Sequence, residues 1–171
     1  EITTWKFNEN GTMEHGTVNF IGGLYKTFDE GAVNCRDHVV RLFQKILAKE
    51  KNIVPVRNIS ITVDKKTGVI SMYNDGNGVD VAKHPDNDLW VPEMIFGHLR
   101  TSTNYNKEEK KIVGGKNGFG FKLVLIYSLW GEIETVDHIR KKKYTQRFED
   151  NLTTICPPTI KRSTAKPYTK V

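Results

Sequence analysis

The spacing of apolar residues predicts one long helix and one β-hairpin in the first half of the chain. Over residues 24–50, apolar side chains recur at steps of three and four, as on a helix with one buried face. The predicted buried stripe consists of Phe28, Ala32, Cys35, Val39, Leu42 and Ile46. Apolar residues alternate instead over 59–63, a polar turn follows at 65–68, and 69–73 return, so we expect a hairpin.

Shorter patterns predict further strands and helices on either side. Residues 91–99 begin next to a proline and favour a short helix. Residues 121–130 are mostly apolar and fit either a helix or a strand, and the glycines before them favour a helix. The remaining predicted strands are 2–8, 16–21, 132–136 and 143–149. These elements predict an α+β fold, a two-layer sandwich of a mixed or antiparallel sheet with helices on one face.

Composition is typical of a soluble globular protein. The 171 residues are 37% hydrophobic and 27% charged, and no apolar run approaches the ~20 residues of a membrane span. The first residues, "EITTWKFNEN", do not resemble a signal peptide, and Cys35 and Cys156 do not form a disulfide or zinc pattern. We therefore expect one domain in a reducing, intracellular compartment.

The chain carries a net charge of +6 and a pI of about 9.2. Its basic residues cluster at 107–111, 140–143 and 161–162, which permits work near DNA. Solvated loops would give the same clusters, so the charge alone leaves both interpretations open.

Polar residues repeat along the face of the long helix opposite the predicted stripe. They are Glu30, Asn34, Asp37 and Arg41, a pattern that any solvated helix face also gives. However, Asn34 and the neighbouring Gly31 both disfavour a helix interior, which indicates a functional site. Glu30 could deprotonate a water molecule, while the amide oxygen of Asn34 suits magnesium.

The sequence "NDGNG" at 74–78 follows the second strand of the predicted hairpin. An ordinary turn explains it, but Asp75 could also accept a hydrogen bond from the amino group of a ligand. The glycines, including Gly78, would then let a flat ring lie against the backbone.

The stretch "GGKNGFGFK" at 114–122 contains four glycines. Phe121 stands where a Walker A loop needs lysine, and the GxxGxG spacing is not that of a dinucleotide fold. The bare backbone could still bind phosphate, with charge from Lys116 and Lys122, or it could be a glycine hinge. The polar loop at 100–117 that precedes it is typical of a lid, and "RTSTNY" offers hydroxyl groups for ribose or phosphate.

The order of these motifs resembles the ATP-binding fold shared by gyrase-type topoisomerases, heat-shock chaperone ATPases, histidine kinases and MutL-type repair proteins (the GHKL fold). Within it, the chain is most similar to the ATPase domain of eukaryotic-type DNA topoisomerase II, a type IIA enzyme, including its giant-virus versions. The segments that carry this resemblance are "GLYKTFDEGAVNCRDH", "NDGNGV", "VPEMIFGHLRTSTNY" and "GGKNGFGFKLVLIYS".

The resemblance implies a role for each matching residue. Glu30 would be the general base, Asn34 would ligate Mg²⁺, and Asp75 would bind the adenine amino group. The residues implied to contact ribose or the phosphates of ATP are Ser102, Thr103, Asn104, Gly115, Lys116, Asn117, Gly118, Phe119, Gly120 and Lys122. Three residues are unusual for the family: Gly31, Cys35 and Phe121. A fourth residue, Lys26, is typical of the eukaryotic branch of the family.

The resemblance also implies partners and a mechanism. ATP binding would drive dimerisation of two chains and the capture of duplex DNA for strand passage. A nucleotide-gated clamp of chaperone or mismatch-repair type is the alternative, and a basic DNA-binding module without nucleotide is a third possibility. Residues 1–171 would be the N-terminal ATP-binding domain, ending inside its sheet, without the transducer and DNA-cleaving regions and weakly active alone. The expected location is the nucleus in a cell, or a cytoplasmic viral factory or virion in a virus.

Overall fold

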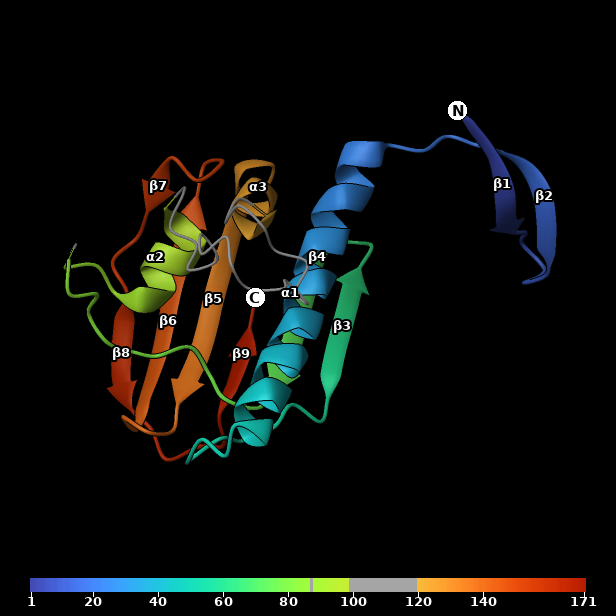
Figure 1. Cartoon of the computed structure of the whole chain (residues 1–171). Helices are drawn as coiled ribbons and strands as arrows, with labels where there is room; N and C mark the ends of the chain where they lie inside the picture. The colour runs from blue at the N-terminus through green and yellow to red at the C-terminus, as the bar shows by residue number, and fades with distance from the viewer. Residues whose placement is uncertain (87, 99–119) are drawn as a thin grey trace.

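The structure, a computed structural model, describes residues 1–86, 88–98 and 120–171 (Figure 1). The helices of this part are α1 (Gly22–Leu47), α2 (Val91–Gly97) and α3 (Gly120–Ile126). The strands are β1 (Ile2–Phe7), β2 (Met13–Val18), β3 (Ile59–Asp64), β4 (Val69–Asp75), β5 (Trp130–Asp137), β6 (Lys142–Glu149), β7 (Thr154–Ile155), β8 (Thr159–Arg162) and β9 (Tyr168–Lys170).

The main sheet has the order β3-β4-β9-β5-β6-β7, and β8 also pairs with β6. Each pairing in the described part of the chain is antiparallel, and α1, α2 and α3 all lie on one face of this sheet (Figure 1). The predicted α+β sandwich is therefore confirmed. The strands β1 and β2 form a separate hairpin that extends away from the sheet (Figure 1).

The short strand β9 joins the two halves of the sheet. It pairs with β4 on one side and with β5 on the other. Val171 continues this contact, because its backbone exchanges two hydrogen bonds of 2.8 and 2.9 Å with Met72. The last residues of the chain thus hold β4, which faces α1, beside β5, which belongs to the core under α3.

The observed elements follow the predicted ones closely, with small shifts at their ends. The helix predicted over 24–50 ends at Leu47, and Lys49 then adopts a left-handed conformation with φ 59°. The strand predicted at 16–21 lies three residues earlier, as β2. The ambiguous segment 121–130 contains α3 and then reaches the first residue of β5.

The hydrophobic core lies between α3 and the strands β5 and β6. Its fully buried members are Val81, Leu125, Ile133, Tyr144 and Phe148. The predicted stripe of α1 is only partly correct: Cys35 and Leu42 are buried, but Ile46 is 39% exposed. The buried face of α1 is centred instead on Gly31 and Cys35, because Gly31 can approach the sheet more closely than any larger residue.

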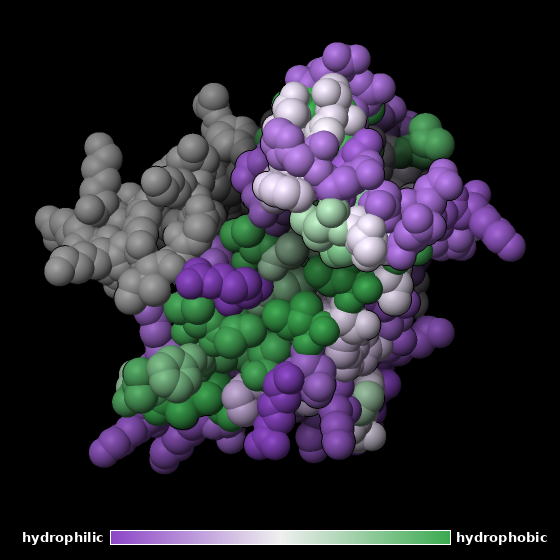
Figure 2. Space-filling view, turned by 90° about the vertical axis from the view of Figure 1, so that its right-hand side faces the viewer, coloured by the Kyte–Doolittle hydropathy of each residue, from purple (hydrophilic) through white to green (hydrophobic). Residues whose placement is uncertain are grey.

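The rest of the predicted stripe borders an exposed apolar flank between α1 and β3. Figure 2 looks at the molecule from this side and shows apolar side chains gathered there. The exposed apolar residues of the two elements include Phe43, Leu47, Ile59, Ile61 and Val63. None of the described helices has both the length and the apolar character needed to cross a membrane.

The turn between β5 and β6 is fixed by the buried carboxylate of Asp137. It accepts hydrogen bonds from the backbone N–H groups of Val81, Ile139 and Arg140 and from the Arg140 guanidinium, at 2.9–3.0 Å. Burial alone would raise the pKa of Asp137, but these hydrogen bonds outweigh burial and lower the pKa below its ordinary value. The segment around Val81, which follows β4 in the sequence, is thereby tied to the turn that follows β5.

We predict that Asp137→Asn destabilises the chain by about 2 kcal/mol at pH 7, because buried donors lose a charged acceptor. A carboxyl group with a lowered folded pKa stabilises the fold above its unfolded pKa of about 3.9, and this contribution disappears as the pH falls through the folded pKa. Urea unfolding of the parent and the variant should therefore differ at pH 7 and converge in acid.

The matched control is Asp80→Asn, since Asp80 also pairs with Arg140 but is 60% exposed. This change should alter stability by less than about 1 kcal/mol. Equal effects of the two substitutions would contradict the central role of Asp137.

Candidate functional site

The helix α1 lies along β4 and contacts both this strand and the residues that directly follow it. A Cβ at Gly31 would overlap the sulphur of Met72, and a Cβ at Gly76 would lie 3.1 Å from Leu42. Between these points, His38 Nε2 lies 2.7 Å from the backbone oxygen of Asn77. The part of α1 that carries Glu30 and Asn34 is therefore held between the sheet and α3. From the sequence alone, this face of the helix could equally have been exposed to solvent.

The carboxylate of Glu30 lies against the first residue of α3. A Cβ at Gly120 would overlap Glu30 Oε2 and lie 2.9 Å from Glu30 Cδ. The other oxygen, Oε1, pairs with Lys26 one turn earlier at 2.9 Å. Gly120 is thus a position where the absence of a side chain brings a carboxylate and the backbone of α3 together.

Lys26 holds this carboxylate from the side of α1. Hydrogen bonds to Asp29 and Glu30, both 2.9 Å long, raise the pKa of Lys26 above its ordinary value. Lys26 therefore stays protonated at neutral pH and provides a cation next to Glu30.

Asn34 follows Glu30 by one turn and is half-buried. Its amide makes no hydrogen bond with any residue that the structure describes, so its oxygen is available as a ligand. No cluster of three His, Cys, Asp or Glu side chains in the described ranges could hold a metal ion. A single amide ligand still fits Mg²⁺, because this ion keeps several waters and binds substrate phosphates alongside one or two protein ligands.

Lys122 places a cation inside the helix layer, two residues after Gly120. Its side chain is 3% exposed, and burial lowers its pKa to about 8. The ammonium group therefore remains mostly charged at pH 7. Its positive charge thus lies on α3, two residues after the contact with Glu30.

Asp75 differs from the prediction. Its Oδ1 accepts hydrogen bonds from the backbone N–H groups of Arg57 and Asn58, at 2.6 and 2.8 Å, and its Oδ2 accepts one from Asn58 Nδ2 at 2.8 Å. Burial would raise the pKa of Asp75, but these hydrogen bonds lower it overall. The carboxylate thus anchors the segment before β3, and this geometry does not support its predicted role toward a ligand.

Asn74 is a candidate that the sequence analysis missed. Side chains alternate along a strand, so Asn74 shares the helix-facing side of β4 with Met72, while Asp75 points to the other side. Asn74 is 5% exposed and lies between the contacts that Met72 and Gly76 make with α1. The alternation of β4 was the signal that could have identified it.

Two other predicted features have structural explanations. Gly78 approaches β5 so closely that a Cβ would overlap Val136 O and lie 2.7 Å from Thr135 Oγ1. The missing side chain at Gly78 therefore makes room for protein atoms, where we expected a flat ring. Asp37 is also not on a solvated face: it is 3% exposed and pairs with Arg36 at 3.1 Å.

Part of the predicted site lies outside the described residues. This applies to the lid at 100–117, to Ser102, Thr103 and Asn104, and to the segment from Gly115 to Phe119. Within the described part, the structure brings Glu30 of α1 and Gly120 of α3 together, and Asn34 and Lys122 follow them by one turn and by two residues on their own helices.

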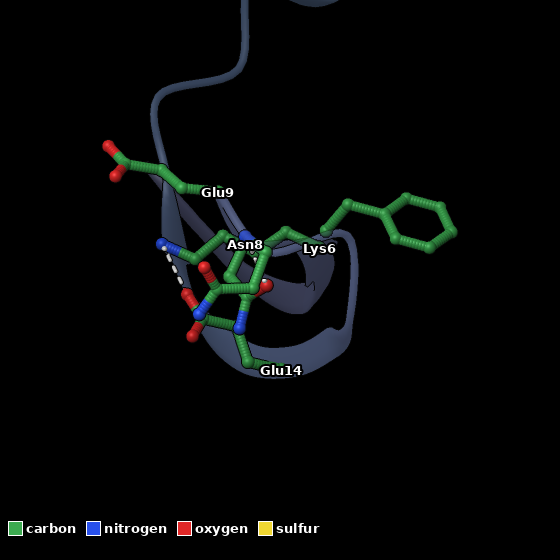
Figure 3. A pocket seen from close by; sticks show the side chains of 6 residues that line it. Lys6, Asn8, Glu9 and Glu14 are labelled. Carbon is green, nitrogen blue, oxygen red and sulfur yellow. Dashed lines mark hydrogen bonds and ion pairs between the residues drawn. The ribbon is translucent and has the colours of Figure 1, made fainter.

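A separate hollow lies at the turn of the β1–β2 hairpin. It is lined by six residues of this hairpin: Lys6, Phe7, Asn8, Glu9, Asn10 and Glu14 (Figure 3). Lys6 pairs with Glu14 at 3.4 Å, and Asn8 Oδ1 accepts two backbone hydrogen bonds within the turn. One hairpin provides all of these residues, none of which belongs to the predicted site.

The basic cluster at 140–143 is partly neutralised by neighbouring carboxylates. Arg140 pairs with Asp80 and Asp137, and Lys143 pairs with Glu134. Lys142 lies over the ring of Trp90, 5.6 Å from its centre. These contacts give much of the cluster a structural role.

Comparison with known proteins identifies close relatives. The DNA topoisomerase 2 of Acanthamoeba polyphaga mimivirus is 44% identical over 172 residues, which cover 98% of this chain and 13% of that protein. The crystal structure of the ATPase region of Saccharomyces cerevisiae topoisomerase II matches with a TM-score of 0.84 and 35% identity, over 99% of this chain and 43% of that one.

The structure of the ATPase and transducer domains of DNA topoisomerase II from Balamuthia mandrillaris matches equally well. Its TM-score is 0.83 at 35% identity, over 99% of this chain and 42% of that one. No family model matches the chain. The chain therefore spans less than half of each of these solved structures and a small part of the mimivirus protein.

We predict that Asp75→Ala acts on stability, because two backbone N–H groups lose a charged acceptor. Thermal unfolding should show a loss of about 1–2 kcal/mol at pH 7. Asp86→Ala is the control, since the Asp86 side chain is 86% exposed, and it should leave the unfolding temperature nearly unchanged. A stability of the Asp75 variant equal to that of the parent would argue against the anchoring role.

Proposed function

Because the chain belongs to the DNA topoisomerase II family and matches part of its ATPase region, we propose that it binds and hydrolyses ATP to drive DNA strand passage. The observation that carries the proposal is the contact between the Glu30 carboxylate and Gly120 at the start of α3. It joins the only two segments of the described chain that the sequence analysis assigned to phosphate chemistry.

In this proposal, Glu30 activates the water that attacks ATP. The carboxylate accepts a proton from the water, the water oxygen forms a bond to the γ-phosphorus, and the bond from that phosphorus to the leaving oxygen of ADP breaks. Such transfers depend mainly on positioning and electrostatics. The Lys26 ion pair supports the role of Glu30, because it fixes one carboxylate oxygen on α1 and leaves the other beside α3.

Asn34 and Lys122 supply the complementary groups. The amide oxygen of Asn34, which has no hydrogen-bond partner among the described residues, would be a ligand of magnesium, which neutralises phosphate charge when it is bound. Lys122 would attract the phosphates from α3, and its pKa of about 8 keeps it charged at neutral pH. We include Gly120 in the phosphate-binding segment, together with the residues from 115 to 119.

Asn74 is the residue we propose for base recognition in place of Asp75. Its buried amide nitrogen donates one hydrogen bond to the backbone oxygen of Asp75 at 2.9 Å, which leaves a second N–H donor and the amide oxygen, and adenine presents both a donor and an acceptor on its edge. Its position on the helix-facing side of β4, level with the Asn34 region of α1, supports this assignment.

Dimerisation and DNA capture belong to the same proposal. The β1–β2 hairpin extends away from the sheet (Figure 1). It exposes apolar side chains, among them Trp5 at 63% and Phe7 at 72%. Apolar groups of this size are typical of surfaces that a partner covers. The relatives favour a topoisomerase over a chaperone-type or repair-type clamp.

We predict that Glu30→Gln in the full-length protein lowers kcat for ATP hydrolysis by at least about 100-fold. The amide retains the shape of the side chain but cannot accept the proton from water. Binding of a fluorescent ATP analogue should change by less than about threefold, because the phosphate-binding groups remain.

Asn34→Ala is the contrasting variant and should weaken binding itself in a magnesium-dependent way. Unimpaired hydrolysis by the Glu30 variant would remove Glu30 from the catalytic role. If the Asn34 variant binds nucleotide as tightly as the parent protein in the presence of magnesium, Asn34 is not a ligand of the metal.

The two neighbours Asn74 and Asp75 provide a second test. We predict that Asn74→Ala lowers the affinity for ATP about tenfold and reduces the preference for ATP over GTP, since one base-directed hydrogen-bonding group is lost. Asp75→Ala should leave both quantities within about twofold at a temperature where it remains folded. Titration with labelled ATP and GTP measures both, and the reverse pattern would restore Asp75 as the base-recognition residue.

A further inference from the structure

Two consecutive pairs of residues contribute to the contact between α1 and α3. Glu30 meets Gly120, as described above, and the next residue on each helix forms the second pair. A Cβ at Gly31 would lie 3.6 Å from Cε2 of Phe121, which is an ordinary van der Waals distance. Each pair thus combines a glycine with a larger side chain. The larger residue belongs to α1 in the first pair (Glu30) and to α3 in the second (Phe121).

Phe121 also contacts α2 on its other side. Its ring meets that of Phe96 edge to face, with the ring centres 5.3 Å apart and the planes at 86°. Phe121 packs against the core that lies over β5 and β6. The ring is therefore held between α1, α2 and the core, and its position determines where α3 begins.

On the side of α1 that faces Phe121, Gly31 has no side chain, so side chains from other elements fill the space in front of it. The space in front of Gly31 is occupied by Met72, whose Cε lies 2.9 Å from a Cβ at that position. Met72 fills it from the sheet and Phe121 fills it from α3. The separation of α1 and α3 at this point is thus set by the ring of Phe121.

We infer that Phe121 is a positioning residue for Glu30: its ring fixes the start of α3, and Gly120 with it, against the Glu30 carboxylate. This inference rests on the proposed function, since it assigns Phe121 to the orientation of the general base. Without the ring, α3 can shift relative to α1, and Glu30 Oε2 loses its fixed position beside Gly120 while Oε1 keeps its pair with Lys26. Displacements near 1 Å are enough to slow a chemical step by about 100-fold.

The test compares kcat with nucleotide affinity in the full-length protein. Phe121→Ala should lower kcat for ATP hydrolysis about tenfold and leave the Kd of a fluorescent ATP analogue within about threefold. Phe121→Leu, which refills most of the volume, should recover at least half of kcat. Leu123→Ala is the control on the same helix, because Leu123 is 40% exposed, and it should keep the parent kcat.

A second pair of variants tests the complementary shapes directly. Gly31→Leu should lower kcat, since the new side chain enters space held by Met72 and Phe121. Combining it with Phe121→Ala gives the new side chain the space of the lost ring, although Met72 still has to move. The double variant should therefore lose less kcat than the product of the two single effects. Independent, multiplicative effects of the two changes would overturn the inference.

The outcomes separate this inference from the proposed function. Failure of the parent protein to bind and hydrolyse ATP would overturn both. Hydrolysis that depends on Glu30 but is unchanged by Phe121→Ala would overturn the positioning role alone. The same holds if Phe121→Ala weakens nucleotide binding in proportion to kcat, or if its loss of kcat is matched by Leu123→Ala.

Discussion

The close approach of α1 to its neighbours is the constraint on which the site depends. Gly31 lets the helix rest on Met72 of β4, and Gly120 lets α3 reach the side chain of Glu30. A methyl group at either position would overlap atoms that are in place. Because the helix is held at this depth, a carboxylate and an amide that look solvated in sequence instead lie between the sheet and a second helix.

Glycine has the same physical function at several positions of this fold, and only some of them concern a ligand. Gly78 lies against the backbone of β5, and Gly76 combines a φ of +88° with a close approach to Val56. Both are explained by contacts within the protein. A cluster of glycines therefore indicates that something approaches the backbone closely, but the chemistry of the neighbouring side chains has to decide whether that is a protein group or a phosphate.

The sequence predicted most of the elements because their periodicity was strong, and it failed where the deciding contact was tertiary. The hairpin of β3 and β4 and the pair β5–β6 were correct because alternation and polar turns are local signals. The buried stripe of α1 was misplaced because Gly31 and His38, which lie on the buried side, contribute no apolar signal. The insertion of β9 between β4 and β5 was not predicted, since a strand of three residues has no readable period.

The choice between Asn74 and Asp75 depends on strand geometry that residue type alone does not give. Asp75 was predicted from the motif "NDGNG", in which a carboxylate can accept a hydrogen bond from a ligand. A shift of one residue along a strand, however, moves a side chain to the opposite face, and here it moves the carboxylate away from α1. The buried position is left to a neutral amide, which avoids the large desolvation cost of a charge and offers a donor as well as an acceptor. Burial in this part of the molecule thus favours asparagine over aspartate, for the same physical reason that Lys122 on α3 releases its proton more readily than an exposed lysine.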